Sequence, residues 1–444
     1  MSVVAVRRFG AEMALAVCAL LFVSGAVGAP SRSIRYVDGS TARCSNSAGS
    51  GSLKQPFCTI GGAAAHISAG VTVKVAAGIY RERVVVQASG TARRPIVFTA
   101  APRARVVISG QKNGFSISNR NWIRLNGFTV TRTSEYGISV SDASHVTLSN
   151  NRVSYAGRPI SGQAQYWIRL GNVTRSRVIA NTVEHNTNSG IALVSGSFGN
   201  EVKGNRSFAN AKVFERAASG IRLYTSHANG IHQNVTYGNE DSGIELDKSH
   251  DNVVSNNISY SNGDHGIDAT GGSSGTRILA NSIYGNLTAG INVEGGSTGV
   301  TVANNISSGN GIDSPRTDSN IRVDAASVPG TSLDYDVVYL GGGEHFLIWN
   351  SLSYRSLAAF QAATGQERHG IEADPKWSNK AAGNFRLSAR SPAIDSADSS
   401  VRSQPRADIH GTRRTDDPAT PNTGVGPRRY DDRGAFEFHP IRGR

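Results

Sequence analysis

A repeat of about two dozen residues constrains the fold of this chain more than any other feature. Five segments, SGIALV, SGIRLY, SGIELD, HGIDAT and AGINVE, share one pattern, and their glycines are Gly190, Gly220, Gly243, Gly266 and Gly290. An asparagine recurs with the same spacing, at Asn181, Asn205, Asn234, Asn257, Asn281 and Asn305. A second asparagine lies five residues after each of these. Two registers kept over six turns are typical of a solenoid, whose coils bury their apolar faces against one another.

Strand alternation within the repeat predicts the fold. After each glycine, apolar and polar residues alternate, as in Ile244 and Leu246 against Glu245 and Asp247, so one face points inward. Asparagine tolerates tight turns, and a column of asparagines at equivalent bends can form a side-chain ladder. We therefore predict an all-β protein, a right-handed parallel β-helix over residues 30–400. Asn-X-Ser/Thr tripeptides in this column are interpreted as by-products of the ladder, with glycosylation as the lesser alternative.

Segments outside the regular repeat are predicted to close the solenoid. PFCTIGGAAAHISAG near the N-terminus predicts a short helix that covers the open end of the core, because exposed strand edges invite pairing with other chains. Residues 401–444 are predicted to be a closing segment or irregular tail, and Ser391–Asp395 and Gly434–Phe438 are predicted to be closing strands. Residues 211–218 carry an insertion into the repeat, which indicates either a loop on a binding face or a neutral surface loop.

The N-terminal residues predict export. Residues 1–29 combine two arginines, a short apolar run and small residues, which is typical of a cleaved secretion signal; a retained membrane anchor is the alternative. The mature chain then keeps Cys44 and Cys58, and an even pair in a secreted, extracellular protein predicts one disulfide, with two buried thiols as the alternative. No later segment is apolar enough to cross a membrane, so no membrane partner is expected.

The charge balance limits the class of partner. The chain carries 46 basic and 33 acidic residues, a formal charge of +13, which favours a polyanion. Nucleic acid is not expected, because the chain has neither a dense basic helix nor an aromatic stacking motif. An acidic polysaccharide suits an exported protein better, and a basic surface that only maintains solubility is the alternative. We expect a monomer.

Stacking of equivalent positions places the outward residues in columns. One column holds Arg169, Ala192, Arg222, Glu245, Asp268, Asn292 and Arg322, and a second holds Val194, Tyr224, Asp247, Thr270, Glu294 and Asp324. Two adjacent coils thereby gather five carboxylates, Asp241, Glu245, Asp247, Asp264 and Asp268. Carboxylates about 5 Å apart repel one another, and Ca²⁺, which takes about six to eight oxygen ligands, would relieve the repulsion. The alternative is a solvated acidic face relieved by Arg222 and Lys248.

The stretch from Tyr36 through PFCTIGGAA, AAGIYRERVVV and RPIVFTAAP resembles the N-terminal region of family 9 polysaccharide lyases. This resemblance implies a calcium-dependent right-handed β-helix that cleaves pectate by β-elimination with a lysine base. The family's Asp-Asp-Gly-X-Asp calcium motif is approached by residues 241–245 and 264–268, but each copy lacks the second aspartate. The preceding coil offers Ser219 before its glycine, and the position of the family's lysine falls on Asn281 or Asn304.

Catalytic and binding residues follow from the same columns. A base beside the α-proton and a positive charge beside the developing enolate are needed for elimination, and Lys248, Lys212 and Arg222 are the candidates. Substrate contacts are predicted for Arg169, Arg222, Tyr224 and Asn292. The chain's histidines, His265 among them, lack metal-binding helical spacing and are interpreted as surface or turn residues.

Three functions are compatible with these residues. A calcium-assisted lyase on an acidic polysaccharide is favoured. A non-catalytic glycan-binding solenoid comes second. A glycoside hydrolase that uses Glu245 and Asp268, on adjacent coils and near the retaining distance, comes third.

Overall fold

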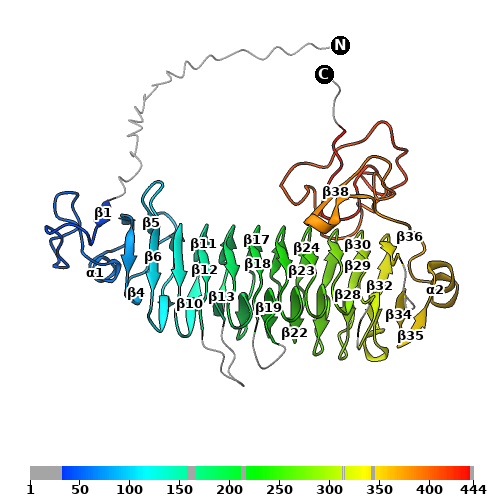
Figure 1. Ribbon diagram of the computed structural model, residues 1–444, viewed down its shortest axis with the longest axis horizontal. Coiled ribbons are helices and arrows are strands. Elements are labelled where there is room, and N and C mark those ends of the chain that lie inside the picture. Colours follow the sequence, from blue (N-terminus) through cyan, green and yellow to red (C-terminus); the bar gives the residue numbers. More distant parts are fainter. Residues whose placement is uncertain are drawn as a thin grey trace, which may run out of the picture. The chain divides into compact units, whose positions relative to one another are not determined.

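The structure is a computed structural model, and it describes residues 33–157, 166–211, 217–312, 314, 316–341 and 346–440. The predicted signal sequence over residues 1–29 and Lys212 lie outside the described residues. Within the described part of the chain, three long sheets, parallel except at the last strand of one of them, wind into a right-handed β-helix (Figure 1). The predicted fold class is thus confirmed.

The three sheets each contain twelve strands among the described residues. The first sheet holds, in order, β1 (Ile34–Val37), β2 (Thr72–Val75), β5 (Ile96–Ala100), β8 (Ile123–Asn126), β11 (Thr147–Ser149), β14 (Arg177–Ile179), β17 (Glu201–Lys203), β20 (Gly230–His232), β23 (Val253–Ser255), β26 (Arg277–Leu279), β29 (Thr301–Ala303) and β32 (Ser332–Asp334). The second sheet holds β4 (Val84–Val86), β7 (Asn113–Ser118), β10 (Tyr136–Ser144), β13 (Ile168–Thr174), β16 (Ile191–Val194), β19 (Ile221–Tyr224), β22 (Ile244–Asp247), β25 (Ile267–Thr270), β28 (Ala289–Val293), β31 (Ser319–Val323), β34 (Leu347–Trp349) and β35 (Leu352–Tyr354). The third sheet holds β3 (Gly78–Tyr80), β6 (Val106–Ser109), β9 (Phe128–Thr131), β12 (Arg152–Ser154), β15 (Thr182–Glu184), β18 (Arg206–Phe208), β21 (Val235–Tyr237), β24 (Ile258–Tyr260), β27 (Ser282–Tyr284), β30 (Ile306–Ser308), β33 (Val337–Tyr339) and β36 (Ile371–Glu372).

Close approach of neighbouring coils explains the glycine column that defines the repeat. A Cβ atom at Gly220 would lie 2.7 Å from the carbonyl oxygen of Gly243, and one at Gly243 would lie 2.7 Å from that of Gly266. Any side chain would therefore push one coil away from the next. The residues that follow, Ile221, Ile244 and Ile267, pair in register across the sheet and are fully buried, as the internal isoleucine ladder requires.

Asparagine ladders run along two of the turns, as predicted. The Oδ1 atom of Asn257 accepts from the backbone N–H and the Nδ2 of Asn234, and the Nδ2 of Asn257 donates to Oδ1 of Asn281 at 3.0 Å. The ladder ends at Asp336, whose Oδ1 accepts hydrogen bonds from the backbone N–H and the Nδ2 of Asn305. An aspartate suits this last position, because its side chain has to accept hydrogen bonds but has no further ladder residue to which it must donate. The left-handed residue is the one before each ladder asparagine, for example Asn256 with φ of 52°. The ladder asparagines are buried and already hydrogen-bonded, which excludes the glycosylation alternative for the folded chain.

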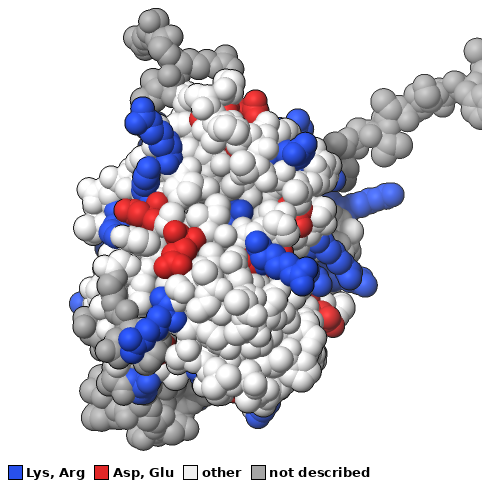
Figure 2. Space-filling view, turned by 90° about the vertical axis from the view of Figure 1, so that its right-hand side faces the viewer, with Lys and Arg blue, Asp and Glu red and all other residues white. Residues whose placement is uncertain are grey.

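Helices close both ends of the solenoid. The predicted N-terminal cap is α1 (Ile60–Ala65), which begins with the side chain of Thr59 accepting from the N–H of Gly62 and buries Ile60 against the core. At the other end, α2 (Leu357–Thr364) packs Phe360 into the same core. Figure 2 views the end that carries α2, where side chains of both charges lie scattered over a mostly uncharged surface. No helix among the described residues has the length and apolarity needed to cross a bilayer.

The C-terminal segment packs on the outer face of the third sheet. It contains an antiparallel pair, β37 (Trp377–Asn379) and β38 (Asn384–Leu387), followed by irregular chain. Phe385 and Phe436 pack against Ile258 of β24, and Ile394 packs against Ile306 of β30. The prediction of closing strands at Ser391–Asp395 and Gly434–Phe438 was wrong. Their apolar residues are buried on the sheet's outer face, not paired with its edge, so they need no ladder of hydrogen bonds.

Candidate active site on the second sheet

One outward column of the second sheet carries the predicted polar residues in strict register. Pairs of Cα partners link Arg169, Ala192, Arg222, Glu245, Asp268, Asn292 and Arg322 across β13, β16, β19, β22, β25, β28 and β31. Neighbouring strands in such a sheet are about 4.8 Å apart, so each of these residues lies directly beside the next. The vertical alignment on which the predicted site depends is therefore present.

Glu245 and Asp268 form the centre of the column. Their strand neighbours Ile244, Leu246 and Ile267 point into the core, so both carboxyl groups point outward. Yet Glu245 is only 8% exposed and Asp268 only 6%. Two outward carboxyl groups that are nearly withdrawn from water are costly in their charged form, which is a condition typical of acid–base catalysts.

Glu245 is held by a hydroxyl and a guanidinium group. The Oγ of Ser219 donates to Oε2 of Glu245 at 2.6 Å, and Nη2 of Arg222 lies 3.2 Å from Oε1. The same nitrogen of Arg222 lies 3.3 Å from Oδ2 of Asp247. Burial raises the pKa of Glu245, and the Arg222 charge and the Ser219 hydrogen bond oppose the rise. Burial also raises the pKa of the Tyr166 hydroxyl, and the Arg222 charge opposes that rise.

Asp268 has a different environment. The Nδ2 of Asn292 donates to Oδ1 of Asp268 at 2.8 Å, and Arg322 Nη1 donates to Oδ1 of Asn292 at 2.8 Å and to Oε2 of Glu294 at 2.6 Å. Burial holds the pKa of Asp268 well above its usual range, and the carboxylates of Glu294 and Glu245 add to the rise. No guanidinium group pairs with Asp268 among the described residues. Asp268 therefore lacks the neighbouring positive charge that favours the ionised form of Glu245.

His265 lies beside this pair. One ligand atom each from His265, Asp268 and Glu294 lies within 4.8 Å of the other two. The backbone N–H of Ala289 donates to Nδ1 of His265 at 3.1 Å, so in the neutral ring Nδ1 is an acceptor and Nε2 carries the proton. His265 lies in the turn before β25, as one of the two interpretations has it, but it is not a surface residue, because it is buried and hydrogen-bonded to the next coil.

The five carboxylates predicted to bind calcium do not form one open cage. Glu245 and Asp247 share Arg222, and Asp264 lies 3.1 Å from Nη2 of Arg316 and accepts from Thr288 at 2.6 Å. Asp241 lies in the turn before β22 and has an interaction partner as well. Arginines thus relieve much of the repulsion from which calcium was inferred. Calcium would have to compete with these arginines for the carboxylates, and calcium binding stays a prediction.

Of the candidate bases and binding residues, Arg222 and Asn292 contact the acid pair. Lys248 follows β22 in a left-handed turn with φ of 51°, is exposed, and places Nζ 5.7 Å from the Tyr224 ring centroid. Arg222 pairs with Glu245 and Asp247, and its guanidinium carbon lies 5.7 Å from the centroid of the same Tyr224 ring. Arg169 lies 5.9 Å from the ring centroid of Tyr136. Of these residues, Arg222 alone contacts Glu245.

The positions counted for the family's lysine lie elsewhere. Asn281 belongs to the buried asparagine ladder, and Asn304 donates to Gln404 and to the backbone of Asp398 in the C-terminal segment. Both are fully buried. Neither can serve as a base on the second sheet.

Sequence reasoning missed Tyr166, Ser219 and His265. Ser219 and His265 occupy the position before the column glycines, which the repeat made visible but which was not assigned a role. Tyr166 lies in the connection before β13, where no periodicity predicts the direction of a side chain. Glu294 and Arg322 stood in the predicted columns, and the structure adds them to the site.

Comparison with known proteins supports the architecture. The family model for the right handed beta helix region matches residues 113–279 and 199–326. The uncharacterized protein YwoF of Bacillus subtilis (strain 168) is 25% identical over 418 residues, covering 77% of this chain and 89% of YwoF. Among solved structures, pectate lyase Pel9A has a TM-score of 0.54 at 18% identity, covering 93% of this chain and 98% of its own. The complex of XylC with xylose has a TM-score of 0.56 at 13% identity, covering 78% and 87%. These likenesses show the fold, a right-handed parallel β-helix.

Proposed function

We propose that this protein is a polysaccharide-active enzyme that cleaves an acidic, uronate-containing polysaccharide by β-elimination at Glu245 and Asp268. The observation that supports the proposal is the in-register pair of outward but buried carboxyl groups: burial raises the pKa of both, and Arg222 pairs with Glu245. The fold shared with pectate lyase Pel9A and with the xylose complex of XylC is consistent with a sugar polymer as substrate. Export, if residues 1–29 are a signal, would bring the enzyme to such polymers.

Each carboxyl group suits one proton transfer. The Arg222 guanidinium favours the ionised form of Glu245, which makes Glu245 the base that takes the proton beside the uronate carboxylate. The carbon–hydrogen electrons form the new double bond, and the bond to the glycosidic oxygen breaks. Asp268, which keeps its proton, donates it to the departing oxygen. Arg222 supplies positive charge where the enolate develops.

The test is an assay of the purified chain on pectate, alginate and glycosaminoglycans, with calcium and with a chelator. Unsaturated sugar, seen by its ultraviolet absorbance, is the expected product. Glu245→Gln and Asp268→Asn should each lower kcat about 100-fold to 10,000-fold. The matched control is Glu201→Gln, an outward glutamate of the first sheet that pairs with Arg177 at 2.8 Å and should leave kcat unchanged. Absence of unsaturated product from every polymer under both conditions would refute the proposal.

Glycoside hydrolysis is the second candidate, and the spacing of the acid pair favours it. Carboxyl groups on adjacent hydrogen-bonded strands start about 4.8 Å apart, close to the separation of about 5–5.5 Å in retaining glycosidases. New reducing ends without unsaturation would identify this reaction. Glycan binding that survives both substitutions, with no turnover of any polymer, would instead indicate a non-catalytic binding protein.

A further inference from the structure

We propose a second, non-catalytic binding site for an anionic sugar at the N-terminal end of the first sheet. A cavity of about 430 Å³ lies there, and its walls come from β1, β2, the loop over residues 38–56 and the turn after β5. It is separated from the β22 coil by about seven strand spacings of the first sheet, or roughly 34 Å. The inference goes beyond the proposed function, because it requires no catalysis.

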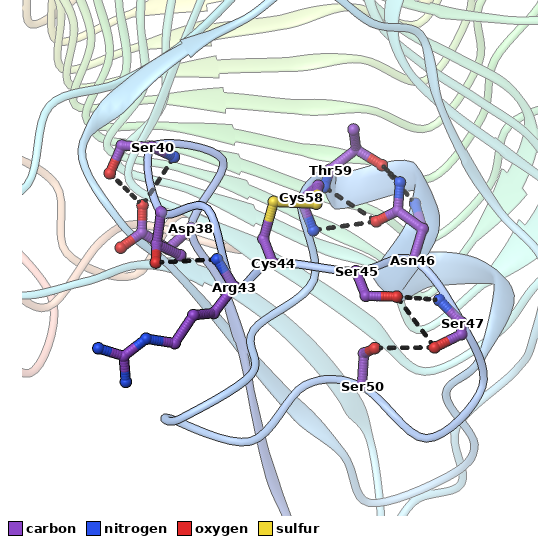
Figure 3. The surroundings of a disulfide bond; sticks show 12 residues. Asp38, Ser40, Arg43, Cys44, Ser45, Asn46, Ser47, Ser50, Cys58 and Thr59 are labelled. Carbon is purple, nitrogen blue, oxygen red and sulfur yellow. Dashed lines mark hydrogen bonds between the residues drawn. A yellow bond between two sulfur atoms is a disulfide. The ribbon is translucent and has the colours of Figure 1, made fainter.

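The chain builds this cavity on a rigid frame. Tyr36 of β1 and Lys74 of β2 are Cα partners, so their side chains lie next to each other on the outer face of the sheet. The free edge of β1 is closed by the following loop: Tyr36 N–H donates to the Gly51 oxygen at 2.9 Å, and Phe57 N–H donates to the Tyr36 oxygen at 2.9 Å. The disulfide between Cys44 and Cys58 ties the same loop, as predicted (Figure 3). A wall held in this way is preorganised for a ligand.

The charges on the rim point to an anion. Arg43, Lys54 and Lys74 line the cavity, and none of them forms an ion pair within the described part of the chain. Asp38 is the acidic residue among the lining side chains, and its Oδ1 accepts from the N–H and the Oγ of Ser40, toward which it turns in Figure 3. Three cations against one satisfied carboxylate leave the rim electropositive.

The floor points to a sugar. The remaining lining residues are mostly apolar or aromatic: Tyr36, Val37, Leu53, Pro56, Ala76, Ala101 and Pro102. An inorganic anion would leave this apolar surface unused, and a neutral sugar would leave the cations without a partner. A carboxylated sugar satisfies both, because its C–H face covers the apolar floor while its carboxylate meets the rim. Such a site would hold a polymer at a distance from the acid pair.

The test is calorimetric titration of the Glu245→Gln/Asp268→Asn chain, in which turnover is removed. The probes are the galacturonate trimer, the mannuronate trimer and the neutral methyl ester of each. At least one acidic trimer should bind, and its ester should bind more weakly. Arg43→Gln with Lys74→Met should weaken binding on the order of tenfold, since the two substitutions remove two of the three cations that line the cavity. The matched control is Lys203→Met, an outward lysine of the same sheet on β17, which should bind normally.

Each contrary outcome overturns the inference. Equal binding of trimer and ester removes the role of charge. An equal loss in the Lys203→Met control shows attraction to the basic surface in general. Absence of binding by both acidic trimers shows that no such site exists. None of these results depends on cleavage, so failure of the proposed lyase activity would leave the binding test intact.

Discussion

Replacement of Asn257 by alanine should destabilise the β-helix by about 3–5 kcal/mol. The Asn257 side chain makes four hydrogen bonds: its Oδ1 accepts from N and Nδ2 of Asn234 at 2.9 and 3.0 Å, and its Nδ2 donates to the Ile231 oxygen at 2.9 Å and to Oδ1 of Asn281 at 3.0 Å. Each bond contributes about 1 kcal/mol net, and a buried N–H left without a partner costs about 1–3 kcal/mol. Asn257 is fully buried, so water can replace its bonds only by opening the turn.

The assay is urea-induced unfolding, with the midpoint and the slope measured for both chains. The control is Asn422→Ala: Asn422 is exposed and donates to Asp416 at 2.8 Å, so its loss should stay within about 0.5 kcal/mol. A loss below about 1 kcal/mol for Asn257→Ala would refute the view that the ladder stabilises the coils. It would show that the glycine and isoleucine columns alone hold them in register.

Three further predictions concern titration and cross-linking. Burial raises the pKa of Asp395 to about 7, so the folded chain binds this proton more tightly than the unfolded chain does. The free energy of unfolding should therefore fall as pH rises from about 4 to about 7, and Asp395→Asn should flatten that fall in unfolding curves recorded across this range. Cys44→Ser with Cys58→Ser opens a loop of sequence separation 14, which should cost about 3 kcal/mol in urea unfolding. The pH profile of kcat/KM should be bell-shaped, with its acidic limb set by Glu245 and its basic limb by Asp268, both above the usual carboxyl range; a flat profile would contradict these roles.

The central residues of the candidate site could be predicted from the sequence, because equivalent residues of successive coils lie next to one another in a solenoid. Once the repeat is aligned, the place of a residue in its coil determines both the face it occupies and its neighbours above and below. Glu245 and Asp268 are Cα partners, as are Arg222 and Glu245, in agreement with the predicted column. The disulfide was predictable for a simpler reason, since two cysteines remained for one bond.

The connections between the strands have no repeating pattern from which the position of a side chain could be predicted. Tyr166 lies in the connection before β13, and Arg316 reaches Asp264 across 52 residues from the connection before β31. The carboxylates chosen as calcium ligands were chosen for their proximity, and the structure pairs three of them with arginines. Counting along the chain placed a family lysine on Asn281 and Asn304, which belong to turns and not to the second sheet.

The sequence by itself therefore determined the coil, its register and the outward carboxyl pair, because each depends on a local period that repeats. Only the tertiary structure decided which carboxyl groups pair with arginines, which are buried, and where loop and strand enclose a cavity. Those properties depend on burial and on contacts between residues far apart in the chain, which the repeat in the sequence does not predict.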